Sequence, residues 1–263
     1  MKKNALALAA LLGFSASAAQ AAIVIDDFND PFAAPGQSVY TDGTPATDTL
    51  LATGLTGVLG GSRELSITCD SGCIDNSSSR NATLTVEAGE LAWTNGTNVK
   101  STAQVMWNAN GAGLNADMLS MGNAIVATVL EADLGFNYTL TLWTSDTDYT
   151  SLISGTLFAV DPSAPEEAFY NLDWFELVDG DYVLGGLPFS IDNTGAGVDL
   201  TDVNKITFAL TNTGTCYQSG LACSAAVDLR IDDATLRIPE PASVALLGLG
   251  LLGLAGMRMR KQA

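Results

Sequence analysis

Apolar and polar residues alternate through most of the chain between residues 22 and 238. In four segments every second side chain is apolar, which is typical of strands that bury one face. Two further runs are rich in apolar and β-branched residues and predict inner strands. Clusters of Asn, Asp and Gly between the runs predict turns. The alternating segments are 65–68, 82–87, 138–143 and 227–232, the apolar runs are 124–130 and 206–210, and the turn clusters are 95–96, 179–181 and 193–195.

Helical periodicity is weak along the same stretch, and only residues 164–168 suggest a helical turn. Many short strands separated by turns are typical of sandwiches and barrels. We therefore predict an all-β fold, an antiparallel β-sandwich of jelly-roll type. No low-complexity run divides residues 22–238, so a single domain is expected there.

Residues 1–21 have the three parts of a secretory signal peptide. Lys2 and Lys3 give a positive start, a short apolar stretch follows, and residues 19–21 place small side chains at a cleavage site. The apolar stretch is too short for a permanent membrane span, which needs about 20 residues. The alternative is a buried N-terminal helix. We expect a cleavable signal peptide and export by the Sec pathway.

The last segment, residues 239–263, has a different order of features. A Pro-Glu-Pro triplet comes first, an uncharged run rich in Leu, Ala and Gly covers residues 242–257, and a basic tail follows. The run is slightly short for a permanent span. Because basic residues stay on the cytoplasmic side, we predict a short C-terminal transmembrane helix that ends in the cytoplasm. The triplet is Pro239, Glu240 and Pro241, and the tail carries Arg258, Arg260 and Lys261.

This order of features resembles the PEP-CTERM sorting signal of Gram-negative bacteria, which has a Pro-Glu-Pro triplet, a Leu/Gly/Ala helix and a basic terminus. The resemblance covers residues 238–263, about a tenth of the chain. It implies recognition by a membrane-embedded exosortase, transient anchoring in the inner membrane and cleavage near the triplet. Delivery to the cell surface or to the extracellular polysaccharide matrix would follow. The alternative is an ordinary C-terminal membrane tail.

The composition narrows the chemistry that the chain can perform. The 263 residues include no histidine, 11 basic and 29 acidic residues, and the formal net charge is −18. Without histidine, a Ser-His-Asp triad, Cys-His zinc sites and the usual iron or copper sites lack a key group. Residues 22–238 carry 6 of the basic and 28 of the acidic residues. Phosphate backbones repel such a chain, so nucleic acid is not expected as a partner.

The four cysteines, Cys69, Cys73, Cys216 and Cys223, form an even set in a chain that is predicted to be exported. Disulfides persist in oxidising compartments, so two bridges are expected. The Cys-x3-Cys spacing could also suggest metal binding. Of the three possible connectivities we favour Cys69–Cys73 and Cys216–Cys223, because each pair brackets a loop at the end of a predicted strand.

Acidic pairs stand near the start and the end of the predicted domain. They are Asp26 with Asp27, and Asp232 with Asp233. Matching acidic terminal strands loosely resemble the galactose-binding-type jelly rolls of carbohydrate-binding modules, in which those strands lie near each other. Because Ca²⁺ takes several carboxylate and carbonyl oxygens, the four residues could hold a structural calcium ion that ties the two strands together. The alternative is a set of ordinary acids that face solvent near strand ends.

Sugar recognition would need an accessible aromatic ring, because aromatic faces stack on the apolar faces of pyranose rings. Trp107 and Trp143 fall in strong strand patterns and are expected in the core. Trp174 lies in an irregular stretch flanked by acids and is the best candidate for sugar stacking. The alternative for Trp174 is also a core position.

These features predict an exported, non-enzymatic protein of the cell surface or the exopolysaccharide matrix of a biofilm, processed by an exosortase. A carbohydrate-binding module with a structural calcium is the alternative, with extracellular polysaccharide as the partner. A surface glycoside hydrolase is the least favoured class. Hydrolysis needs two carboxylates at a defined separation, and nothing in the sequence singles out two among 28 acids. No catalytic residue is therefore assigned.

Overall fold

The computed structural model describes most of the chain between its two ends. The described residues are 22–30, 36–41, 46–74, 80–132, 135–155, 160, 163–184, 187–216, 222–223 and 227–238. The chain divides into two units, one of which is Ile23–Arg237 and the other Met1–Ala22 together with Ile238–Ala263. The predicted signal peptide and the predicted C-terminal helix lie outside the described residues.

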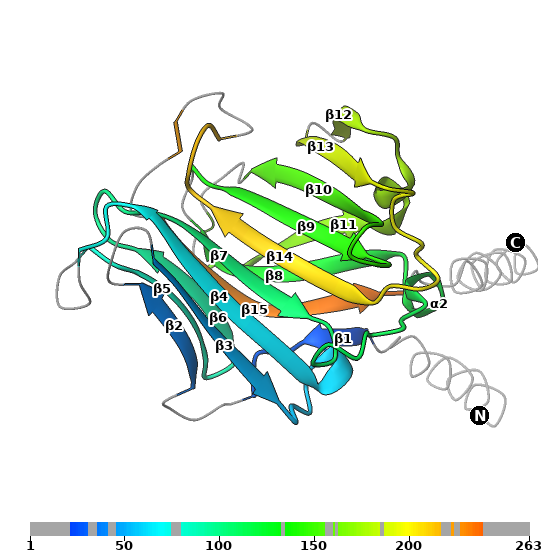
Figure 1. The fold of residues 1–263 in the computed structure, drawn as a ribbon, viewed down its shortest axis with the longest axis horizontal. Coiled ribbons are helices and arrows are strands. Elements are labelled where there is room, and N and C mark those ends of the chain that lie inside the picture. Colours follow the sequence, from blue (N-terminus) through cyan, green and yellow to red (C-terminus); the bar gives the residue numbers. More distant parts are fainter. Residues whose placement is uncertain are drawn as a thin grey trace, which may run out of the picture. The chain divides into compact units, whose positions relative to one another are not determined.

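Two antiparallel sheets make up the unit Ile23–Arg237 (Figure 1). In the first sheet the strand order is β11 (Glu166–Asn171), β8 (Ala124–Ala132), β15 (Asp228–Arg237), β6 (Glu90–Asn95), β5 (Ala82–Glu87) and β2 (Gln37–Thr41), and β1 (Ile23–Asp26) also pairs with β15. In the second sheet the order is β12 (Gly180–Leu184), β13 (Leu187–Thr194), β10 (Tyr149–Gly155), β9 (Asn137–Trp143), β14 (Lys205–Thr211), β7 (Lys100–Trp107), β4 (Ser62–Ser71) and β3 (Ala46–Thr53). The prediction of an all-β, antiparallel sandwich is confirmed. The jelly-roll type stays a prediction.

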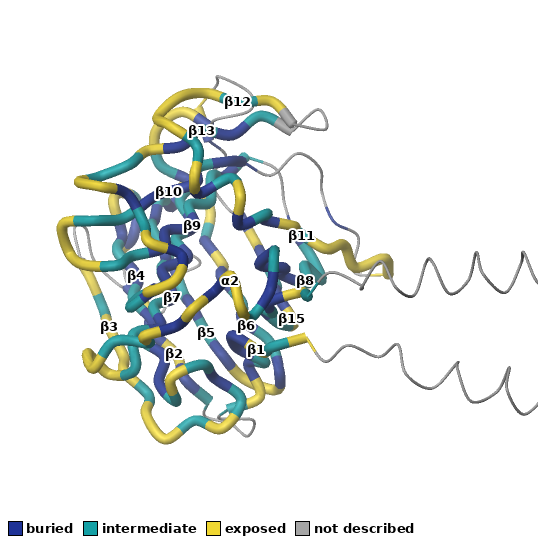
Figure 2. Tube along the Cα trace, turned by 90° about the vertical axis from the view of Figure 1, so that its right-hand side faces the viewer, coloured by how far each residue is buried: buried dark blue, intermediate teal, exposed yellow. Residues whose placement is uncertain are grey.

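Side-chain alternation explains how the two sheets enclose one core. In β5 the buried residues are Ala82, Leu84 and Val86, and the residues between them are partly exposed. The same alternation continues in the neighbouring strands, so each sheet turns one apolar face inward. Figure 2 shows buried residues mainly in the strands, and exposed residues mainly in the connecting loops and in the outer strand β11. Trp93 lies in this core and packs edge-on against Phe136, with ring centroids 5.6 Å apart.

The sandwich is closed differently at its two edges. At one edge β2 and β3 pack together, and the Tyr40 N–H donates to Asp48 Oδ2 at 3.2 Å. At the other edge the outer strands are β11 and β12, and the 3₁₀ helix η2 (Leu172–Glu176) follows β11 and contacts β10. Two other short helical segments, η1 (Leu59–Gly61) and α2 (Met118–Met121), lie in connections between strands.

The first and last strands lie side by side, as the sequence analysis expects. Ile23 pairs with Leu236 and Val24 with Thr235 in an antiparallel ladder. The helical turn suggested at residues 164–168 is wrong, because residues 166–171 form β11 and pair with β8. In the described part of the chain, no helix is both long and apolar enough to cross a membrane.

Candidate functional site

A buried ion pair lies where the sequence analysis expects a calcium ion. Arg63 in β4 and Asp26 at the end of β1 are both fully buried. Arg63 Nη1 donates to both carboxylate oxygens of Asp26, at 2.7 and 2.8 Å. Arg63 Nε donates to Gln37 Oε1 at 2.9 Å, and Trp107 Nε1 donates to Asp26 Oδ2 at 2.8 Å. Because these groups come from both sheets, the pair connects the two layers at the start of the domain.

The surroundings of Asp26 supply what a buried carboxylate needs. The backbone N–H of Phe28 also donates to Asp26 Oδ1, at 2.8 Å. Burial raises the pKa of the Asp26 carboxyl, and the Arg63 guanidinium and the hydrogen bonds from Trp107 and Phe28 oppose that rise. Phe28 also packs under the cation, with the guanidinium carbon 5.6 Å from the ring centroid. Asp26 is therefore held by a protein cation and by N–H donors.

The other predicted calcium ligands do not join Asp26. Asp27 Oδ1 accepts the N–H of Asn29 at 3.0 Å, within its own loop. In β15, Ile231 and Ala234 are both buried while Asp232 and Asp233 between them are not, because the register with β8 shifts there. Such a β-bulge puts two consecutive side chains on the outer face of the sheet.

The calcium hypothesis therefore finds no assembled site at these four residues. Across the described ranges, no three Asp, Glu, His or Cys side chains form a group that could hold a metal ion. Burial and the neighbouring carboxylates of Asp233 and Glu90 raise the pKa of Asp232. The physical reason for the difference from the expectation is the orientation of the side chains, since Asp26 is buried in the core and Asp232 is exposed on the outer face.

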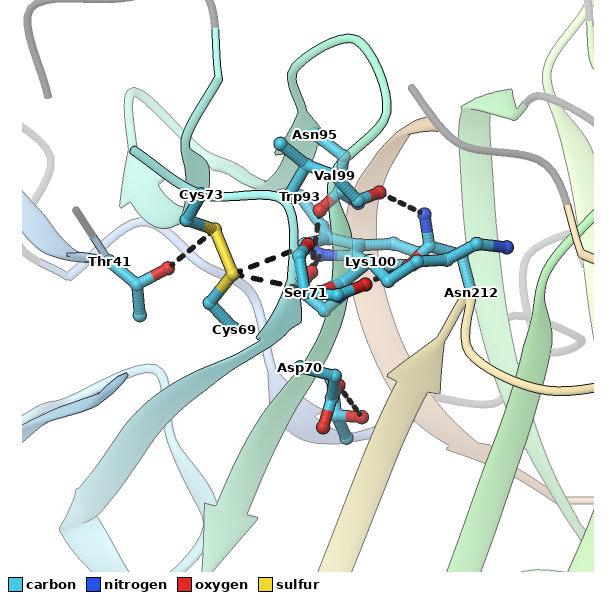
Figure 3. The surroundings of a disulfide bond; sticks show 12 residues. Thr41, Cys69, Asp70, Ser71, Cys73, Trp93, Asn95, Val99, Lys100 and Asn212 are labelled. Atoms are coloured by element: carbon cyan, nitrogen blue, oxygen red, sulfur yellow. Dashed lines mark hydrogen bonds between the residues drawn. A yellow bond between two sulfur atoms is a disulfide. The ribbon is translucent and has the colours of Figure 1, made fainter. Parts of the chain in front are cut away.

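Both predicted disulfides are confirmed, Cys69–Cys73 and Cys216–Cys223. Figure 3 shows the first bond beside Thr41, whose Oγ1 lies 3.5 Å from Cys73 Sγ. The loop that it closes contains Gly72, which has a φ of 89°. A Cβ at this position would lie 2.1 Å from the carbonyl oxygen of Asn98, so only glycine fits this turn.

A buried polar network supports this end of the sandwich (Figure 3). Trp93 Nε1 donates to Ser101 Oγ at 3.1 Å, and Ser101 Oγ donates to Asn95 Oδ1 at 2.5 Å. The N–H of Ser101 donates to Asn212 Oδ1 at 2.7 Å. Lys100 Nζ of β7 donates to the carbonyl oxygen of Cys223 in the second disulfide loop. Burial lowers the pKa of the Lys100 amine. The two disulfide loops are therefore held against β7.

Each bridge closes a short loop, so the loss of one bridge should have a modest effect. We expect the Cys216→Ser, Cys223→Ser double variant to lower the free energy of unfolding by about 2.5 kcal/mol, the loop-closure value for so short a loop. Urea unfolding followed by fluorescence measures this difference. A loss near 5 kcal/mol, the value for a loop of about 100 residues or more, would contradict local pairing.

Trp174 is the predicted sugar-stacking residue, and the structure places it against the core. It belongs to η2 and is partly buried. Its ring stacks on Phe189 of β13, with centroids 5.0 Å apart and an interplanar angle of 20°. Of the two tryptophans expected in the core, Trp107 is buried. The expectation that Trp143 lies in the core is wrong. Its side chain alternates with the buried Leu142, is only partly buried and packs with Tyr149, with ring centroids 3.9 Å apart.

Trp174 also lines a cavity of about 510 Å³ between the two sheets. One wall is made by β11, β8 and β15, and the other by β9, β10, β13 and β14. Most of the lining is apolar, and its larger side chains include Phe136, Leu152, Phe208 and Leu210. The cavity lies toward the edge of the sandwich that carries β11, away from the edge that β2 and β3 close.

Small side chains on the inner face of the first sheet explain the cavity. Ala127 of β8 pairs with Ala168 of β11 on one side and with Ala234 of β15 on the other. Ala127 and Ala168 line the cavity, and Ala234 packs in the core beside Ala127, so these neighbouring strands present only methyl groups at this register. In close-packed interiors such positions usually carry larger residues, so a row of alanines leaves space.

Three uncharged residues with hydroxyl groups also line the cavity, Tyr138, Tyr170 and Ser154. The Tyr138 hydroxyl interacts with Ser154 and Tyr170, and Ser154 Oγ donates to the carbonyl oxygen of Pro188 at 3.0 Å. The two tyrosine rings meet edge to face, with centroids 5.6 Å apart. Burial raises the pKa of both phenols, and that of Tyr170 lies well above its usual value. Both phenols are therefore neutral hydrogen-bonding groups at physiological pH.

The fold and these sites define a class, a disulfide-bonded β-sandwich with a buried ion pair and a cavity between its sheets that is partly open to solvent. A comparison with protein families adds a match at the C-terminal end of the chain. The family model of the PEP-CTERM protein-sorting motif matches residues 237–261. The motif indicates an exported protein with a C-terminal membrane anchor that an exosortase processes. No curated protein and no solved structure shows a significant match to the chain.

Proposed function

We propose that the sandwich is a non-enzymatic component of the cell surface or of the exopolysaccharide matrix of a biofilm. The observation that carries this proposal is the sorting motif at residues 237–261, because it assigns the chain a route out of the cell. In this proposal the exosortase cleaves near Pro239–Pro241 and the domain of residues 22–238 remains as the working molecule.

Two features of the domain support a role without catalysis. The chain has no histidine, which removes the commonest general base. Several carboxylates are already paired with arginines, including Asp26 with Arg63, Glu90 with Arg230 and Glu167 with Arg237. An arginine beside a carboxylate favours its charged form, so carboxylates paired in this way are poorly suited to act as general acids.

Fractionation of the native host tests the proposal. We expect the wild-type protein to be recovered with the extracellular polysaccharide, and a panel of chromogenic glycosides to give no turnover with the purified protein. Recovery only in the inner membrane would overturn the matrix role. Turnover of any glycoside would overturn the non-enzymatic assignment and favour a surface hydrolase.

The alternative, a carbohydrate-binding module, predicts that Trp174 contacts sugar. We expect Trp174→Ala to leave retention on the host polysaccharide unchanged, because the ring already stacks on Phe189. A polysaccharide pull-down measures retention, and Trp143→Ala is the matched control because it removes an indole from the outer face of the second sheet, away from the cavity. Loss of retention in Trp174→Ala but not in the control would favour the carbohydrate-binding role.

A further inference from the structure

The cavity between the sheets has no part in the function proposed above, yet its size is that of a ligand site. Its volume of about 510 Å³ falls within the roughly 300–1,000 Å³ that is typical of small-molecule pockets. Protein interiors are otherwise packed as tightly as organic crystals, and large voids forgo dispersion contacts. A mainly apolar space of this size in a small domain therefore needs an explanation.

The cavity follows from residue choices on several strands. Ala127 and Ala168 form its floor on the first sheet, and on the second sheet β10 contributes the small side chain of Ser154 and Gly155, which has no side chain. Larger apolar rings, Phe136, Phe189 and Phe208, stand around these positions. Aromatic walls around a floor of small residues are typical of pockets that enclose apolar molecules.

The charges around the cavity restrict the ligand further. Among the described residues that line it, none is Lys or Arg, and the charged ones are Glu166 and Glu167. Glu167 is paired with Arg237, which donates from Nη1 to Glu167 Oε2 at 2.8 Å. A carboxylate or phosphate inside the cavity would therefore lose its hydration without gaining a cation. The neutral hydroxyls of Tyr138, Tyr170 and Ser154 suit one uncharged polar group instead.

We propose that the cavity binds an uncharged, predominantly apolar small molecule whose single polar group meets the Tyr138–Tyr170–Ser154 cluster. A long-chain alcohol has this chemistry, and the corresponding fatty acid anion does not. The site would make the exported sandwich a carrier or sensor of a neutral lipid-like compound.

Fluorescence titration with the neutral dye N-phenylnaphthylamine tests the proposal on protein recovered after export and kept free of detergent. We expect the dye to bind at one site per chain. Dodecanol should displace it at a concentration at least about tenfold lower than dodecanoate, since burying an unpaired charge costs more than 1.4 kcal/mol, the equivalent of a factor of ten. Absence of dye binding, or equal displacement by the two compounds, would overturn the proposal.

The Ala168→Phe variant assigns the binding to this cavity. Its ring would project into the space beside Ala127, so we expect dye binding to be lost while the midpoint of thermal unfolding stays the same or rises. Ala92→Phe is the matched control, because Ala92 alternates with the buried Leu91 and Trp93 and lies on the outer face of the first sheet. Dye binding that survives in Ala168→Phe, in a protein whose unfolding midpoint has not fallen, would overturn the assignment.

If Ala168→Phe fails to fold, Ala127→Leu makes a smaller change on the neighbouring strand and is judged by the same two readouts. A further variant tests the polar end. Tyr138→Phe keeps the ring and removes the hydroxyl, so the preference for dodecanol over the dye should fall by about threefold to tenfold, the range of one hydrogen bond. An unchanged preference would contradict the assigned position of the polar group.

Discussion

Replacing Arg63 by methionine should lower the free energy of unfolding by about 3–5 kcal/mol, because it leaves the Asp26 carboxylate buried without its cation. Asp26 is fully buried, and its remaining donors would be the N–H groups of Trp107 and Phe28. The substitution also removes the donor to Gln37 that links β4 to β2. Since a domain is typically stable by about 5–15 kcal/mol, this single change removes a large share of the total.

Denaturant unfolding of wild type and variant measures the loss, with an unchanged slope as the check that both states remain comparable. The matched control is Arg230→Met, which removes an arginine that pairs with Glu90 at a half-exposed position. Exposed pairs contribute about 0–1 kcal/mol, so the control should be nearly neutral. Equal losses in the two variants would contradict the role assigned to the buried pair. Adding Asp26→Asn to Arg63→Met should recover part of the loss, because no unpaired charge then remains in the core.

The second large effect concerns sorting. We expect the Pro239→Ala, Pro241→Ala double variant to stay in the inner membrane, because the triplet that marks the cleavage region is gone while the apolar run and the basic tail remain. Immunoblots of inner-membrane, surface and matrix fractions measure the distribution, and most of the protein should move from the outer fractions to the inner membrane.

Ser243→Ala is the control for this experiment, since it changes one residue of the apolar run and leaves the triplet and tail intact. It should be distributed as the wild type is. If the double variant also reached the surface and the matrix in normal amounts, residues 239–241 would have no part in sorting.

The strands could be predicted because half-burial leaves a period of two in the sequence. The interval predicted from alternation at residues 82–87 coincides with β5, and the one at 138–143 falls within β9. The prediction of a helical turn at residues 164–168 is wrong because β11 is an edge strand. Only Tyr170 is buried in β11, so the alternation of apolar and polar residues is faint there. Pairing of the first and last strands could be expected only from a resemblance, since no local pattern encodes it.

The alternation contained a signal for the buried arginine that the sequence analysis did not use. Arg63 is two residues before Leu65 and four before Ile67, and both of these point inward, so the same period places Arg63 in the core. A basic residue at an inward position predicts a buried acid as its partner. Asp26 could then have been read as that partner and not as a calcium ligand.

The cavity could not be predicted in the same way. Ala127 and Ala168, which line it, are far apart in the sequence and become neighbours only through the register of β8 and β11. Likewise, Asp232 and Asp233 reach the same face only through a bulge, which breaks the period of two. Features that depend on long-range register need the structure.

Intact-mass analysis of the protein recovered outside the host tests the central claim of exosortase processing most directly. We predict a chain that ends near Pro239–Pro241 and has lost residues 242–263, with both disulfides intact. A recovered chain that still ends in Gln262-Ala263 would contradict the claim.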